Sequence, residues 1–131
     1  MKKKTLTWFE LAKGDLEFAE SIVDSAKRPQ YAVHFCHQAI EKILKAIIQE
    51  HTNSIPQKTH NFKILIEQGG IDLPDNLEAN IAKLSPHYLA SKYPEDLEKL
   101  HKVYTVAYAS TILEITKELF LWLENYLISK K

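Results

Sequence analysis

If residues 30–50 form a helix, apolar side chains cover well over half of its circumference. This run contains neither glycine nor proline, and its apolar positions are Ala32, Val33, Phe35, Cys36, Ala39, Ile40, Ile43, Leu44, Ile47 and Ile48. One narrow polar strip interrupts them, formed by His34, Gln38, Glu41, Lys45 and Gln49. A helix that is apolar on so many sides has to pack against neighbours in two directions. The sequence therefore predicts that residues 30–50 form the central helix of an all-α domain.

Two other long runs predict helices over residues 5–26 and 104–128. Their apolar side chains recur at steps of three and four, which is the spacing of one helical face. In the first run this stripe consists of Phe9, Ala12, Leu16, Ala19, Val23 and Ala26. In the last run it consists of Val106, Ala109, Leu113, Thr116, Phe120, Leu123 and Leu127. Gly14 costs the first helix up to about 1 kcal/mol relative to alanine, so we expect another part of the chain to approach closely there.

Helix breakers gather between the long runs. Four of the five prolines and two of the three glycines lie between residues 56 and 94. In that segment Thr59 is a suitable N-cap for a short helix over 60–68, Pro74 opens another helix, and residues 87–98 look irregular. We therefore expect one all-α domain over residues 1–131, folded as an up-and-down helical bundle of about four to five helices.

Composition and charge exclude several classes of protein. The chain has 17 basic and 17 acidic side chains, so its net charge gives no drive toward nucleic acid or an anionic membrane. The basic start lacks the apolar core of a signal peptide, and no stretch reaches the ~18 apolar residues of a membrane span. Cys36 is the only cysteine, which excludes an internal disulfide and a cysteine-based zinc site. We expect a cytoplasmic protein that does not contact a membrane.

The last predicted helix carries a second apolar stripe beside its core stripe. This second stripe consists of Tyr108, Ile115, Trp122 and Tyr126. A domain of this size rarely buries two faces of an outer helix, and exposed aromatic patches often mark a partner surface. We therefore predict a homodimer seam on the last or the central helix. The alternative is that these side chains pack within the bundle.

The central run resembles the characteristic helix of a known family. Residues 38–46 read QAIEKILKA and follow Tyr31-Ala32, an order similar to that of the HEPN domain family (higher eukaryotes and prokaryotes nucleotide-binding). Thr59-His60 and residues 92–95, which read KYPE, resemble two further segments of the family, with lysine in place of the family's arginine. The resemblance extends over roughly residues 8–127.

The resemblance implies an all-α bundle that usually forms a homodimer. It implies a bacterial or archaeal module that is often encoded beside a minimal nucleotidyltransferase. Many members of the family are metal-independent ribonucleases of toxin–antitoxin systems. Others bind RNA or nucleotides without catalysis.

Metal-independent RNA cleavage needs a base, an acid and a cation that steadies the phosphorane. Active members of the family carry an arginine, four to six residues, and then a histidine near the start of the last helix. This chain has one arginine, Arg28, whose spacing to His34 matches that pattern at the head of the central helix instead. The family's arginine–histidine pattern is therefore absent from its expected place.

The expected region offers lysines, a histidine and a tyrosine instead of that pattern. If a catalytic site exists, we predict His101 as the acid or base and Lys92 or Lys99 as the phosphate contact, because lysine neutralises a phosphate without clamping it. Tyr104 would then donate a hydrogen bond. In related toxin systems a tyrosine just after this histidine receives nucleotides from the partner enzyme, although the spacing from His101 to Tyr104 differs slightly.

Glu41, Lys45 and His60 form a second group of candidate ligand contacts. Their structural alternative is a polar strip that fixes helix packing or the dimer, with His60 in the first turn of a capped helix. His34, His37 and Glu41 share one helical face, but a two-metal bundle needs a Glu-x-x-His spacing twice, with two further carboxylates. We therefore expect neither a metal site nor a cofactor.

Three functions remain after these exclusions. The first is a dimeric HEPN-like module that binds a nucleotide or RNA, pairs with a nucleotidyltransferase-type protein and has little or no catalysis of its own. The second is a metal-independent endoribonuclease toxin that uses His101. The third is a helical protein-interaction module without a nucleic-acid role. Whether the chain is an enzyme stays open at this point.

Overall fold

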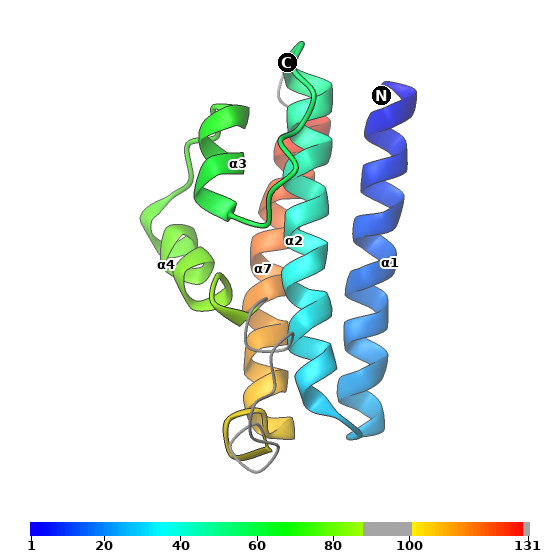
Figure 1. The fold of residues 1–131 in the computed structure, drawn as a ribbon, viewed down its shortest axis with the longest axis vertical. Helices are drawn as coiled ribbons and strands as arrows, with labels where there is room; N and C mark the ends of the chain where they lie inside the picture. The colour runs from blue at the N-terminus through cyan, green and yellow to red at the C-terminus, as the bar shows by residue number, and fades with distance from the viewer. Residues whose placement is uncertain (88–100, 130–131) are drawn as a thin grey trace.

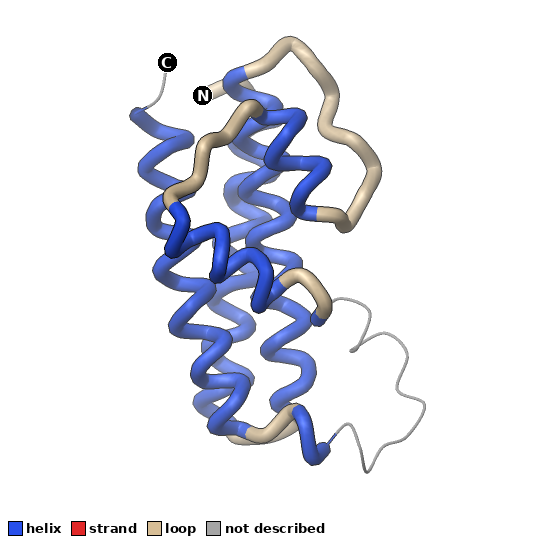
Figure 2. Tube along the Cα trace, turned by 90° about the vertical axis from the view of Figure 1, so that its left-hand side faces the viewer, coloured by secondary structure: helices blue, strands red, loops and turns tan. Residues whose placement is uncertain are grey.

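Three long helices form the body of the molecule. The computed structural model describes residues 1–87 and 101–129, with long helices α1 (Lys3–Ser25), α2 (Pro29–His51) and α7 (Val106–Ser129). α1 and α2 are antiparallel, and α7 lies beside α2 and runs in the same direction (Figure 1). The prediction of an all-α bundle is confirmed. Figure 2 shows helices joined by loops, with no strand among the described residues.

The turn between α1 and α2 is short because its backbone bends through the left-handed region. Ala26 has φ 58° and Arg28 has φ 49°, and Ala26 N–H donates to the carbonyl of Ile22. Pro29 is the first residue of α2, where its fixed φ suits a helix and no N–H is needed. The sequence thus ends one helix and starts the next within four residues, which forces α1 and α2 to pack side by side.

Two short helices flank the long ones. α3 (Phe62–Gly69) packs against α2, and α4 (Asp75–Leu84) packs against α7. α3 ends at Gly70, which adopts φ 62°, a conformation that glycine takes without penalty. These helices lie on one side of the bundle (Figure 1), and the chain between α2 and α7 passes through them.

The core lies along α2, as the apolar pattern predicts. Fourteen of its 23 residues are buried, and its side chains contact α1 on one side and α7 and α3 on the other. Among the largest fully buried side chains are Ile40, Ile43, Leu44, Ile47 and Ile48. Burial of such a side chain contributes about 1.5–3 kcal/mol, so α2 is the element on which the bundle depends most.

Two sequence predictions are wrong. Thr59 does not cap α3: Asn61 does, since its side chain accepts a hydrogen bond from the N–H of Ile64, while Thr59 Oγ1 accepts from the N–H of Asn61. No group approaches Gly14, because a Cβ placed there would meet nothing within 4 Å among the described residues. Residues 88–98 of the predicted irregular segment lie outside the described residues.

The second stripe of the last helix is half-buried. Tyr108, Ile115, Trp122 and Tyr126 pack against the edge of the core, which is the alternative that the sequence left open. Leu121, on the face of α7 away from both stripes, is 60% exposed. The homodimer seam stays a prediction. In the described part of the chain no helix is both long and apolar enough to cross a membrane.

Candidate functional site

Glu41 lies at the centre of a polar cluster on α2. Its Oε2 accepts from Lys45 Nζ at 3.1 Å, one helical turn away, and its Oε1 accepts from His60 Nδ1 at 2.6 Å. Glu41 is 4% and Lys45 8% exposed. Lys45 Nζ also lies 5.4 Å from the centre of the Trp8 ring on α1, close enough for a cation–π contact. The cluster therefore joins α1, α2 and the segment before α3.

The burial of this cluster indicates that it holds the packed helices together. Burying a carboxylate and an ammonium group costs several kcal/mol each, and a close, well-bonded pair offsets that cost. Both oxygens of Glu41 are engaged within the chain, whereas half of the His60 side chain is exposed. Of the predicted ligand contacts in this cluster, only His60 therefore presents a substantial surface to a ligand.

A second ion pair lies on the same face of α2. Lys42 Nζ lies 2.6 Å from Asp15 Oδ2 of α1. Burial lowers the pKa of His34, and the carboxylates of Asp15 and Glu41 oppose that effect. His34 is thus mainly neutral at pH 7, and it adds no fixed positive charge to this face.

His37 lies deeper in the bundle, under α3. It is fully buried, and its ring stacks on the ring of Phe62 with centroids 4.2 Å apart. Burial lowers the pKa of His37 to about 3. His37 therefore stays neutral in the folded protein at physiological pH and serves as a core aromatic side chain. No group of three or more metal-binding side chains exists among the residues that the structure describes.

A Tyr–His–Tyr chain lies at the start of α7. The hydroxyl of Tyr104 is 2.9 Å from Nδ1 of His87, and the hydroxyl of Tyr108 is 2.8 Å from Nε2. Burial lowers the pKa of His87 and raises that of Tyr104 to about 12. A neutral imidazole has one donor and one acceptor nitrogen, so one tyrosine donates to the ring and the other accepts from it.

Of the predicted catalytic residues that the structure describes, one is exposed and one is buried. His101 is exposed, whereas Tyr104 is only 3% exposed and its hydroxyl bonds His87. Lys92 and Lys99 lie outside the described residues, so their relation to His101 stays a prediction. The sequence reasoning missed His87, and the only available signal was a histidine directly after the breaker Pro86.

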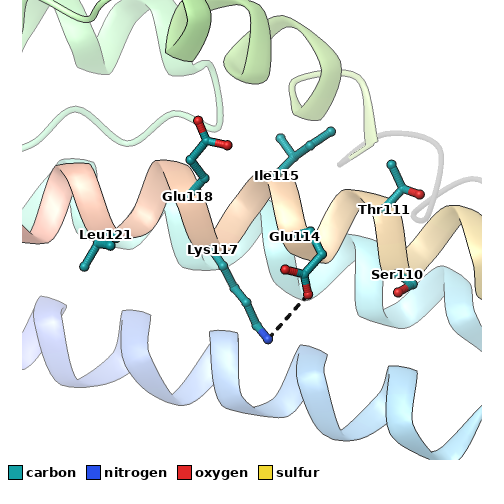
Figure 3. Close-up of a pocket in the computed structure, with 7 residues that line it drawn as sticks. All are labelled: Ser110, Thr111, Glu114, Ile115, Lys117, Glu118 and Leu121. Atoms are coloured by element: carbon teal, nitrogen blue, oxygen red, sulfur yellow. Dashed lines mark ion pairs between the residues drawn. The ribbon is translucent and has the colours of Figure 1, made fainter.

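A hollow of about 630 Å³ runs along the outer face of α7 (Figure 3). Its lining includes Glu114, Glu118 and Lys117, and Lys117 Nζ pairs with Glu114 at 3.6 Å and with Glu20 of α1 at 2.9 Å. Acidic side chains outnumber the single lysine, which disfavours a phosphate there. This face is therefore a poor site for a nucleotide.

The fold and these clusters define a small helical bundle whose long helices are braced by buried polar side chains. The same fold occurs in the crystal structure of TT1696 from Thermus thermophilus, with a TM-score of 0.80 and 19% identity over 95% of this chain and 98% of that chain. At that identity the likeness shows the fold alone. A comparison with curated proteins finds no match.

The family model of the HEPN domain matches residues 5–126. The chain therefore belongs to the HEPN family, and the resemblance seen in the sequence is confirmed. The match covers all of α2, including Glu41 and Lys45, and also the Tyr–His–Tyr chain.

Proposed function

We propose that this chain is a HEPN module that binds a nucleotide or RNA and has little or no catalytic activity of its own. It acts as a cytoplasmic homodimer beside a nucleotidyltransferase-type partner protein. Membership of the family supports the module, and the distribution of charge at one end of the bundle supports the ligand.

The observation that carries this proposal is the basic end of the bundle. The α1–α2 turn and the start of α7 lie at the same end (Figure 1). The exposed cations there are Lys27 and Arg28 of the turn and Lys102 before α7, against one exposed acid of the described residues in the last turn of α1, Asp24. Local positive charge attracts phosphate groups even on a protein whose net charge is zero.

The surroundings of Tyr104 support binding over catalysis. Cleavage of RNA without a metal needs an acid, a base and a cation around one phosphate. Tyr104 is buried against His87, which leaves it poorly placed to reach a phosphate. The chain's one arginine, Arg28, belongs to the α1–α2 turn.

Equilibrium binding of ADP and of a short single-stranded RNA to the purified protein tests the proposal. We expect saturable binding that weakens as salt rises, because phosphate contacts release counterions. The RNA should stay intact over the same period, and light scattering should report a dimer. Absence of binding to both ligands at low salt would contradict the proposal, and cleavage that His101→Ala abolishes would favour a ribonuclease.

A further inference from the structure

A hollow of about 350 Å³ opens beside the α1–α2 turn. Its lining combines Phe18 and Ile22 of α1, Lys27 and Arg28 of the turn, and Tyr31 and Phe35 of α2. Small-molecule sites commonly have volumes of about 300–1,000 Å³, are mostly apolar and contain a few polar groups. The size and lining of this hollow agree with that description.

Two apolar rows form its walls. Phe18 and Ile22 lie one turn apart on α1, and Tyr31 and Phe35 lie one turn apart on α2. The Phe18 and Phe35 rings meet edge to face, with centroids 4.8 Å apart. Phe18 is nevertheless 52% and Tyr31 47% exposed. These two aromatic rings are thus available for a planar ligand to stack on.

Two cations border the hollow where the turn joins the walls. Lys27 and Arg28 are both exposed, and Arg28 adopts a left-handed backbone conformation, which is uncommon for a residue with a side chain. The N–H of Tyr31 donates to the carbonyl of Arg28 at 3.0 Å, so the first turn of α2 holds the arginine in place. A guanidinium can contact two phosphate oxygens at once, which an ammonium cannot.

We propose that this hollow is the nucleotide site, in which the base stacks on Phe18 and Tyr31 and the phosphates contact Arg28 and Lys27. The inference rests on the proposed function and assigns it a place. The charges favour this occupant over an apolar surface of a second copy, because such a surface would remove both cations from water without a partner. The base of a nucleotide covers the two rings, and its phosphates pair with the two cations.

Titration with fluorescently labelled ADP, competed by unlabelled ADP and by adenosine, tests the site. Phe18→Leu and Tyr31→Leu should each raise the Kd for ADP and for adenosine about tenfold, since each removes one stacking ring. Arg28→Gln should raise the Kd for ADP about tenfold and leave that for adenosine unchanged, since adenosine has no phosphate. Circular dichroism and thermal unfolding verify that each variant folds.

Two variants outside the hollow serve as matched controls. Leu11→Ala removes an exposed apolar side chain two turns before Phe18, and Lys63→Gln removes an exposed cation of α3. Both should bind ADP as the original chain does. If the original chain binds ADP and the hollow variants bind it equally well, the site assignment is overturned while the proposed function stands.

Two further outcomes also overturn the assignment. The first is that Phe18→Leu or Tyr31→Leu converts a dimer into a monomer and leaves ADP affinity unchanged, which would make the hollow an interface between copies. The second is that the original chain binds neither ADP nor RNA, in which case the proposed function fails together with its site.

Discussion

Glu41 shows how much one charged residue contributes at a buried position. Its carboxylate pairs with Lys45 and with His60, and both Glu41 and Lys45 are almost inaccessible to water. A buried ion pair adds little net stability relative to apolar side chains of the same size, but removal of one partner leaves the other charge buried alone. The two ions therefore depend on each other.

We expect Glu41→Gln to lower the free energy of unfolding by about 3–5 kcal/mol, because Lys45 would remain buried without its carboxylate. Urea denaturation at pH 7 measures the change. The double variant Glu41→Gln, Lys45→Met should lose less than Glu41→Gln alone, since it removes both charges. Glu10→Gln breaks the exposed Glu10–Lys13 pair and should change stability by less than about 1 kcal/mol. Equal losses in Glu41→Gln and Glu10→Gln would contradict this account.

The sequence identified Glu41, Lys45 and His60 as a related group, but it did not identify His87. Glu41 and Lys45 are one helical turn apart, so their contact follows from the period of the helix. His87 meets Tyr104 and Tyr108 across 17 and 21 residues. Such a contact depends on the path of the chain between α4 and α7, which no local pattern records.

At the scale of the helix, Gly14 is a weak point of α1. It lies exposed in the helix interior, with open space where a side chain would stand. Glycine there costs the helix about 1 kcal/mol relative to alanine. No contact or backbone conformation in the described structure requires a glycine at this position. The sequence analysis expected a close approach because of this cost, although Gly14 lies two residues from both Ala12 and Leu16 and therefore faces away from the apolar stripe.

We therefore expect Gly14→Ala to raise the free energy of unfolding by up to about 1 kcal/mol. Gly70→Ala is the matched control, because Gly70 has φ 62° and alanine is strained in that conformation. It should destabilise the protein although it also has open space around it. Thermal unfolding of both variants decides the matter, and a loss of stability in Gly14→Ala would show that α1 has an unrecognised neighbour at this point.

At the scale of the whole molecule, buried histidines link stability to pH. Burial lowers the pKa of His37 to about 3, and it also lowers the pKa values of His34 and His87. An unfolded histidine has a pKa near 6.5, so below that pH the unfolded chain binds protons that the folded chain does not. Stability is therefore full above about pH 6.5 and falls as the pH drops below it.

We expect the free energy of unfolding to fall by about 2 kcal/mol from His37 alone between pH 7 and pH 5. Urea denaturation at pH 7, 6 and 5 measures the slope. His37→Leu should flatten the slope, whatever it does to stability at pH 7, because leucine does not titrate. An unchanged slope in that variant would mean that His37 binds a proton in the folded protein.

The sequence by itself determined the helices, the central place of α2 and the family. These depend on a period of 3.6 residues and on helix breakers, which act over a few neighbouring residues. Only the tertiary structure decided that Asn61 caps α3, that His87 lies between two tyrosines and that Phe18 faces Phe35 beside Arg28. The reason is physical: such contacts depend on how helices are set against one another and on the paths of their loops, and the packing of the whole core selects both.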